Sequence, residues 1–181
     1  MLLCGSEPGD RTDAETEFGS SEYAKVILGE LWGFPPALEL AGEAGLQKTI
    51  IELIEAGLVD SAHDCSQGGL AVALARCSFE KGIGCSVNLV GNGLATEFVL
   101  FGEDSSRIVI SCDPADVARI KEVAAKHGIS ADLLGETVSG NIEVKVDGRV
   151  AVSAPVSDLR DEYEGALERA LRSEPAPAHA G

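Results

Sequence analysis

The stretch Ser61-Ala-His-Asp-Cys-Ser-Gln-Gly-Gly-Leu70 decides the fold, because it joins an apolar run to an amphipathic one through a short polar turn. The apolar run before it is Gly57-Leu-Val-Asp60, and Leu70, Leu74 and Cys77 follow at the spacing i, i+4, i+7. This order predicts a strand, a tight turn, and a helix that opens at the paired glycines.

Two interpretations of the turn are open. A helix start of this kind presents backbone N–H groups and the positive end of a helix dipole, which favour an anion or a magnesium–phosphate group. Asp64 is then the candidate metal ligand, since a hard cation takes oxygen ligands. The alternative is a plain strand-to-helix connection that needs glycine for steric reasons and uses Asp64 or Ser66 as the helix cap. Composition alone favours the alternative, and His63 is expected to be a hydrogen-bonded structural residue.

Composition narrows the class of protein. The chain has 181 residues, of which 45% are hydrophobic and only 4% aromatic, so we expect a folded core built from aliphatic side chains. A net charge of −16 argues against nucleic-acid and anionic-membrane partners. No apolar run reaches membrane-spanning length. Five cysteines without a C-x-x-C pair predict reduced core thiols in a cytoplasmic protein, not disulfides or a zinc site.

The rest of the chain interleaves helix and strand patterns. Loop composition covers residues 5–20, and a short helix is expected over 21–28. Further helices are expected from Pro36 to Gly57, over 68–81 and 96–101, from Asp113 to Gly128, and after Pro155; strands are expected at 1–4, 85–89, 108–110, 133–134, 142–146 and 150–152. In the helix that ends at Gly57, Leu46, Ile50, Leu53 and Ile54 form an apolar stripe.

The pair Asp147-Gly148 predicts a type I′ hairpin, which excludes an all-parallel sheet. We therefore expect an α+β fold, a layered α/β domain with a mixed sheet. The expected organisation is a partial strand, loop and short helix over 1–34, the main domain over 35–172, and a disordered tail over 173–181.

Two further segments carry polar groups. Gly102-Glu-Asp-Ser-Ser-Arg107 offers carboxylates, hydroxyls and a guanidinium within six residues. It can contact a ligand or form a capping turn with an internal salt bridge, and its spacing favours the turn. Gly19-Ser-Ser-Glu-Tyr23 can touch a ligand, but capping of the first helix by Ser21 is the simpler account. Walker, G-x-S-x-G, H-E-x-x-H and G-x-G-x-x-G motifs do not occur.

Four segments, in order, resemble the last domain of the phosphoribosylformylglycinamidine synthase large-subunit family. They are Gly19–Tyr23, Pro35–Leu40, Ser61–Ala75 and Phe101–Arg107. The resemblance runs from about residue 1 to 171 and implies the C-terminal domain of the second aminoimidazole-ribonucleotide-synthetase-like half. The start at Met1, inside an expected strand, fits a truncated or separately encoded piece.

The resemblance implies an ATP-dependent carbon–nitrogen ligase of purine biosynthesis. Such an enzyme converts formylglycinamide ribonucleotide and glutamine-derived ammonia to formylglycinamidine ribonucleotide, using ATP and Mg²⁺. The implied partners are the upstream domains, a glutaminase subunit and a small bridging subunit. The family's catalytic histidine and main ATP and magnesium residues have no counterpart in this chain, so no catalytic residue is assigned and the isolated chain is expected to be inactive.

By internal homology, the resemblance places some residues at a cleft thought to hold a structural nucleotide. The implied ligand-facing set is Asp64, which is also the metal candidate, with Ser66, Gly68, Gly69, Glu103, Asp104, Ser105 and Arg107. The chain departs from the family pattern at Ser20, Gln67 and Ser105, and the last departure bears on ligand contact. The alternatives are a non-catalytic scaffold or nucleotide half-site domain, or a relative of hydrogenase-maturation, selenophosphate or thiamine-phosphate kinase type.

Overall fold

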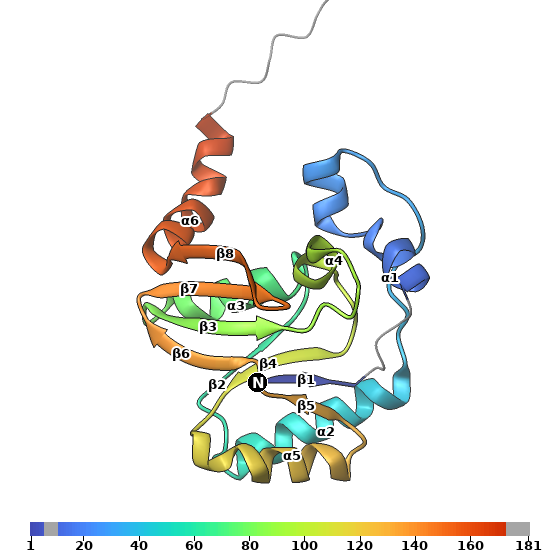
Figure 1. Ribbon diagram of the computed structural model, residues 1–181, viewed down its shortest axis with the longest axis vertical. Helices are drawn as coiled ribbons and strands as arrows, with labels where there is room; N and C mark the ends of the chain where they lie inside the picture. The colour runs from blue at the N-terminus through green and yellow to red at the C-terminus, as the bar shows by residue number, and fades with distance from the viewer. Residues whose placement is uncertain (6–10, 173–181) are drawn as a thin grey trace, which may run out of the picture.

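The computed structural model describes residues 1–5 and 11–172, which form two four-stranded sheets with helices packed against both (Figure 1). The elements in chain order are β1 (Leu2–Cys4), α1 (Arg11–Phe18), the π-helix η1 (Ala24–Leu28), α2 (Leu40–Glu55), β2 (Ser61–Asp64), α3 (Gly69–Phe79), β3 (Ile83–Leu89), α4 (Thr96–Phe101), β4 (Arg107–Ser111), the 3₁₀ turn η2 (Pro114–Asp116), α5 (Val117–Lys126), β5 (Ser130–Asp132), β6 (Gly135–Ser139), β7 (Asn141–Val146), β8 (Arg149–Pro155) and α6 (Val156–Arg172).

The two sheets differ in strand direction. The first has the order β2-β4-β1-β5 and every pair is antiparallel. The second has the order β6-β3-β7-β8, and its central pair, β3 and β7, is parallel. The expected α+β fold with a mixed sheet is therefore confirmed. The β-branched run of residues 108–110 lies in β4, an interior strand, where both faces are covered.

One core lies between the first sheet and helices α2 and α5, which run along the same side of it (Figure 1). Leu3 of β1, Ile110 of β4, Leu53 of α2 and Ile120 of α5 are almost completely buried there. The aliphatic composition thus fills the space between helix and sheet without any aromatic side chain in the buried set.

A second core joins α3 and α6 to one face of the mixed sheet. The register pairs Cys85 with Ile142 and Val87 with Val144, so alternate residues of β3 and β7 point to this same face. All four side chains are buried. The strand alternation read from the sequence therefore places the apolar face correctly.

The hairpin between β7 and β8 has the expected turn. Asp147 and Gly148 both have positive φ angles, 49° and 77°, as a type I′ turn requires. The helices expected at 96–101 and after Pro155 also form, as α4 and α6.

Four expectations about the elements are wrong. Part of the expected 5–20 loop is helix α1, while residues 6–10 lie outside the described residues. The helix expected from Pro36 begins at Leu40, because residues 35–39 are extended or irregular. Leu133 and Leu134 connect β5 to β6 and belong to neither strand. Ile54 faces solvent and lies outside the buried stripe of α2.

Tertiary contacts explain why α1 escapes the sequence pattern. Its sequence, Arg-Thr-Asp-Ala-Glu-Thr-Glu-Phe, has no apolar stripe, and its last residue, Phe18, is the buried one. The helix is held by α4 and by the Trp32 indole, whose Nε1 donates to the Glu15 carbonyl. Such partners lie far along the chain and leave no local signal.

The expected division into residues 1–34, 35–172 and 173–181 stays a prediction. Strand β1 pairs with β4 and β5 inside the first sheet, so the start of the chain and the main domain share one core. The tail expected from Ser173 lies outside the described residues. Within the part of the chain that is described, no helix combines the length and apolar character needed to cross a bilayer.

Two neighbouring residues of α2 test this packing. Replacing Leu53 by Ala empties a site with no solvent exposure and should lower the free energy of unfolding by about 2–5 kcal/mol. Ile54→Ala removes a side chain that is 56% exposed and should cost less than about 1 kcal/mol. Urea unfolding of both variants measures the difference, and equal losses would contradict the orientation of α2.

Candidate functional site

A single carboxylate brings together three of the four segments singled out in the sequence. Glu103 follows the end of α4, and its Oε1 accepts hydrogen bonds from the backbone N–H of Gly68 at 2.8 Å and of Glu22 at 2.9 Å. Gly68 belongs to the turn between β2 and α3, and Glu22 to the segment before η1. A charged acceptor strengthens both bonds, so Glu103 joins chain segments that are 35 and 81 residues away.

The paired glycines meet the steric demand that the sequence suggested. Gly68 and Gly69 have φ angles of +82° and +64°, in the left-handed region. A Cβ atom on Gly69 would lie 2.5 Å from the carbonyl oxygen of Gly102. Glycine therefore allows the start of α3 to touch the backbone at the end of α4. Glu103 follows directly at this point, and its carboxylate bonds the Gly68 N–H.

The expected capping of α3 by Asp64 or Ser66 is wrong. Gly68 is the N-cap residue, and no side chain caps the helix there; the Glu103 carboxylate bonds its N–H instead. Asp64 ends β2 with a side chain that is 72% exposed, and Ser66 contributes its carbonyl, which accepts from the Gly69 N–H.

His63 is engaged by its neighbour. Its Nδ1 lies 2.6 Å from the Asp64 carbonyl oxygen and 3.7 Å from a carboxylate oxygen of the same residue. This contact matches the expected hydrogen-bonded structural histidine.

Arg107 is held within the loop that follows α4. Its side chain is only 10% exposed, and its Nη1 lies 3.2 Å from the Asp104 carboxylate. The same guanidinium donates to the carbonyls of Gly102 and Asp104. The internal salt bridge expected for this loop is confirmed, and it neutralises one of two adjacent carboxylates.

Ser106 ties the same loop to α2. Its hydroxyl donates to Glu43 Oε2 at 2.6 Å, and this bond, followed by one from Gln47, lowers the pKa of the Glu43 carboxyl. Ser105, where the family pattern has Gln, is half-buried beside it. The loop of residues 102–107 therefore contacts α2, α3 and the segment before η1 together.

Sequence reasoning missed an aromatic cluster that supports the site. The Tyr23 and Phe101 rings stack with centroids 4.9 Å apart, and Phe18 contacts Tyr23, Trp32 and Phe98. Five of the eight aromatic residues of the chain thus gather here. The available signal was their clustering at 18–34 and 98–101 in a chain with so few aromatic residues.

The thiols beside the site are not activated. Burial raises the pKa of Cys65, directly after Asp64, to about 12, and that of Cys85 to about 11. All five cysteines are free, as expected. Across residues 1–5 and 11–172, no three His, Cys, Asp or Glu side chains are grouped so that they could hold a metal ion. From these residues Asp64 could supply one oxygen ligand to Mg²⁺, and the others would have to come from elsewhere.

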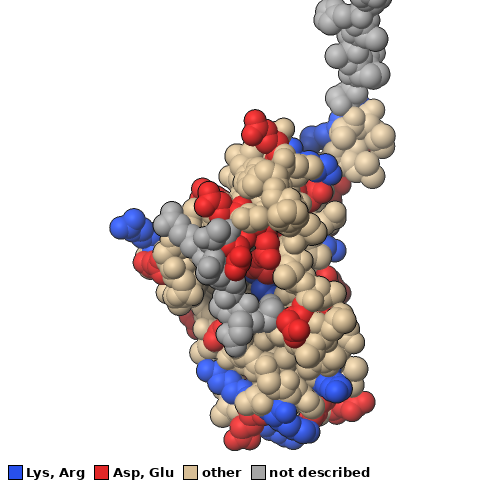
Figure 2. All heavy atoms as spheres, turned by 90° about the vertical axis from the view of Figure 1, so that its right-hand side faces the viewer, with Lys and Arg blue, Asp and Glu red and all other residues tan. Residues whose placement is uncertain are grey.

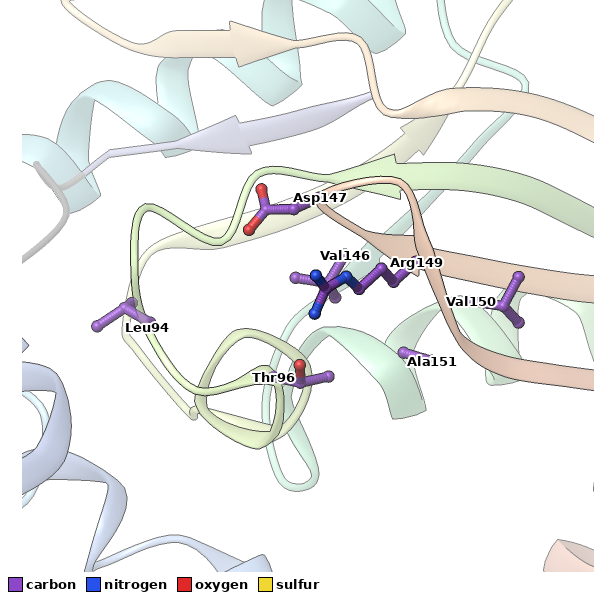
Figure 3. A pocket seen from close by; sticks show the side chains of 7 residues that line it. All are labelled: Leu94, Thr96, Val146, Asp147, Arg149, Val150 and Ala151. Atoms are coloured by element: carbon purple, nitrogen blue, oxygen red, sulfur yellow. The ribbon is translucent and has the colours of Figure 1, made fainter.

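Two surface hollows lie away from the Glu103 contacts. One, of about 570 Å³, lies between the β7–β8 hairpin and the start of α4, and Arg149 reaches into it toward Thr96 (Figure 3). The other, of about 400 Å³, is apolar and lies among α3, α6 and the mixed sheet. Neither is lined by a residue of the predicted ligand-facing set.

Comparison with known families identifies this arrangement. The family described as "AIR synthase related protein, C-terminal domain" matches residues 8–147, which is most of the chain and contains all the segments discussed above. The chain belongs to this family.

Several longer proteins resemble the chain over most of its length. It is 39% identical over 175 residues to phosphoribosylformylglycinamidine synthase subunit PurL of Anaeromyxobacter dehalogenans, covering 91% of the chain and 22% of that protein. The PurL proteins of Thermobifida fusca and Alkaliphilus metalliredigens are 39% and 35% identical, covering 86% and 88% of the chain, and 20% and 21% of their own lengths. The chain spans about a fifth of the length of these relatives.

Solved structures support the AIR synthase related fold. A Thermotoga maritima PurL complexed with ATP superimposes with a TM-score of 0.62 at 25% identity, covering 66% of this chain and 22% of that one. The same protein complexed with FGAR gives a TM-score of 0.73 at 21% identity over 88% of this chain and 27% of that one. The second likeness concerns the fold alone.

The Glu103 contacts can be tested by removing the acceptor. Glu103→Ala leaves the two N–H groups of Gly68 and Glu22 without their partner, and should lower the free energy of unfolding by about 1–3 kcal/mol. Hydrogen exchange at these two amides should accelerate. Glu103→Gln keeps an acceptor oxygen, so its free energy of unfolding and its amide exchange rates should lie between those of Glu103→Ala and the parent chain. Unchanged exchange in Glu103→Ala would contradict the assigned contacts.

The raised thiol pKa values give a dependence on pH. Folded Cys65 keeps its proton to about pH 12, whereas an unfolded thiol loses it near pH 9, so stability should be complete below pH 9 and decline as pH rises toward 12. Iodoacetamide at pH 8, followed by mass spectrometry, should label Cys65 and Cys85 slowly in the native chain and rapidly in urea. Fast native labelling of either thiol would contradict their burial.

Proposed function

We propose that this chain serves as the C-terminal domain of the second aminoimidazole-ribonucleotide-synthetase-like half of a phosphoribosylformylglycinamidine synthase, a cytoplasmic enzyme. The observation that carries the proposal is the identity of 35–39% to PurL proteins over 86–91% of the chain. The geometry supports it, since Glu103 joins segments 19–23, 61–75 and 101–107 in one place. These are three of the four segments on which the resemblance to the synthase rests.

The proposed reaction is the ATP-dependent amidation of formylglycinamide ribonucleotide. ATP transfers its terminal phosphoryl group to the amide oxygen and leaves as ADP; ammonia then attacks the activated carbon, and inorganic phosphate departs. No side chain of this chain is proposed to take part in bond making. Its contribution is to form one wall of a cleft between domains, where ligand sites commonly lie.

Within that wall we propose that Asp64, Ser66, Gly68, Gly69, Glu103, Asp104, Ser105 and Arg107 face the cleft. The support differs among them. Asp64 projects an exposed carboxylate and fits a single oxygen ligand to Mg²⁺, an ion that offsets phosphate charge when bound. Glu103 and Arg107 are already engaged by the chain itself, so we propose that they position the loop and the turn and do not bind ligand directly.

A second candidate is a structural or nucleotide half-site domain with no part in turnover. One observation favours it: the Gly68 N–H at the start of α3, where a phosphate would bind, already bonds the Glu103 carboxylate. Both candidates place the chain in the same assembly. The proposed partners are the remaining domains of the synthase, a glutaminase subunit and a small bridging subunit; a solved structure of PurLQS from Thermotoga maritima shares the fold.

A chimera tests the proposal directly. Replacing the aligned fifth of the Thermobifida fusca protein by this chain should give ADP formation that depends on ammonia and formylglycinamide ribonucleotide, whereas this chain alone should give none. In the chimera, Asp64→Asn should raise the Mg²⁺ concentration for half-maximal rate by about threefold or more, because one oxygen ligand loses its charge. Asp60→Asn, a nearby exposed carboxylate, is the matched control.

The outcomes separate the candidates. Turnover by the chain alone, or a folded chimera without turnover, would contradict the proposed function. A chimera in which Asp64→Asn and Asp60→Asn both match the parent would support the structural domain instead.

A further inference from the structure

The segment that begins at η1 exposes an unusual amount of apolar surface. Of the seventeen large hydrophobic side chains that are exposed in the described residues, eight lie within residues 26–40. The six most exposed range from 56% to 72% and are Val26, Ile27, Leu31, Phe34, Leu38 and Leu40. Scattered exposed hydrophobic residues are normal, but a gathered patch marks an interaction site. We call it the 26–40 surface.

The 26–40 surface is also poor in charge. Only Glu30 and Glu39 carry charge within it, although the chain as a whole has a net charge of −16. Figure 2 shows a mass of uncharged atoms in the upper part of the face that carries this segment, with acidic side chains around it. This contrast disfavours a charged partner such as nucleic acid or an anionic bilayer, and favours an apolar protein surface.

Hydrogen bonds tie the middle of the 26–40 surface to α1 and to the residue that follows it. The Trp32 N–H donates to the Gly19 carbonyl at 3.0 Å, and its indole Nε1 donates to the Glu15 carbonyl at 3.1 Å. The Ala37 N–H donates to Glu17 Oε1 at 3.1 Å. A surface already ordered in this way loses little conformational entropy on binding.

The surface is continuous with the Glu103 contacts. Only Tyr23 separates Glu22 from the start of η1. The Glu22 N–H donates to Glu103, and the Tyr23 ring stacks on Phe101. The start of the 26–40 surface is therefore connected to the Glu103 contacts through Glu22 and Tyr23.

We propose that the 26–40 surface is the seat of another folded domain of the synthase, which docks through an apolar face and closes over the Glu103 contacts. This inference rests on the proposed function. The length of the relatives supports it, because about four-fifths of each PurL protein lies outside the region matched by this chain. An exposed apolar patch in a protein of that size is covered most simply by a neighbouring domain of the same polypeptide.

Hydroxyl-radical footprinting with mass spectrometry tests the proposal on this chain and on the Thermobifida fusca chimera. Modification of Phe34 and Leu38 should fall by at least about fivefold in the chimera, as expected for side chains that enter an interface core. Val90 and Leu133, which are 69% and 58% exposed on other parts of the surface, should stay accessible and serve as the reference. Equal protection of both pairs, or of neither, would overturn the proposal.

A matched pair of double variants tests which residues carry the docking. In the chimera, Phe34→Ser with Leu38→Ser should raise modification of Val26 and Leu31 by about fivefold, back to its level in this chain alone, since two large apolar side chains no longer enter the interface. Val90→Ser with Leu133→Ser should not.

Sedimentation velocity of this chain alone tests the rival occupant, a second copy. A monomer is expected, and a dimer that Phe34→Ser with Leu38→Ser dissociates would overturn the proposal even if the chimera failed to fold. Protection without turnover would leave the docking intact and contradict the function. Turnover without protection would support the proposed function and overturn the docking proposal.

Discussion

The Glu103 carboxylate, which accepts the N–H groups of Gly68 and Glu22, is the contact on which the arrangement of this domain depends. It joins the turn after β2, the end of α4 and the segment before η1, which share no sheet. Two charge-assisted bonds to backbone donors stabilise the contact and also fix the positions of the segments, because the donors cannot rotate independently of the main chain. The α3 N-terminus, an anion-binding feature in principle, is thus satisfied by an anion of the same chain.

The surrounding chemistry is consistent with a positioning role for this loop. Arg107 balances Asp104 and donates to two carbonyls, so the buried guanidinium is satisfied within six residues of chain. Ser106 extends the same loop to Glu43 on α2. Glycine at position 69 lets the backbones of α3 and α4 meet without a side chain between them. The partners of Glu103, Asp104, Ser106 and Arg107 therefore fix this loop, as the proposed cleft wall requires.

Local patterns predicted most of the fold. Alternation in β3 and β7, the Asp147-Gly148 turn and the helix over 96–101 depend on near neighbours, and they are correct. Helix α1 and the exposure of Ile54 depend on packing with distant segments, which no local pattern contains. For the site, the sequence identified the segments but not their contacts: it assigned capping to Asp64 or Ser66, whereas the acceptor comes from Glu103, 35 residues beyond Gly68.

Two exposed features of the domain differ in chemistry. The buried side chains of both cores are mostly aliphatic, and the polar groups of residues 102–107 have hydrogen-bond partners within the domain. Asp64 and the 26–40 surface are both exposed, the first a carboxylate 3.7 Å from His63 Nδ1 and the second an apolar patch. Both are attached to the Glu103 contacts, Asp64 through the turn and the patch through Glu22. A neighbouring domain docked on the patch, as proposed, would be linked to that turn by the Glu22 backbone and the Glu103 carboxylate.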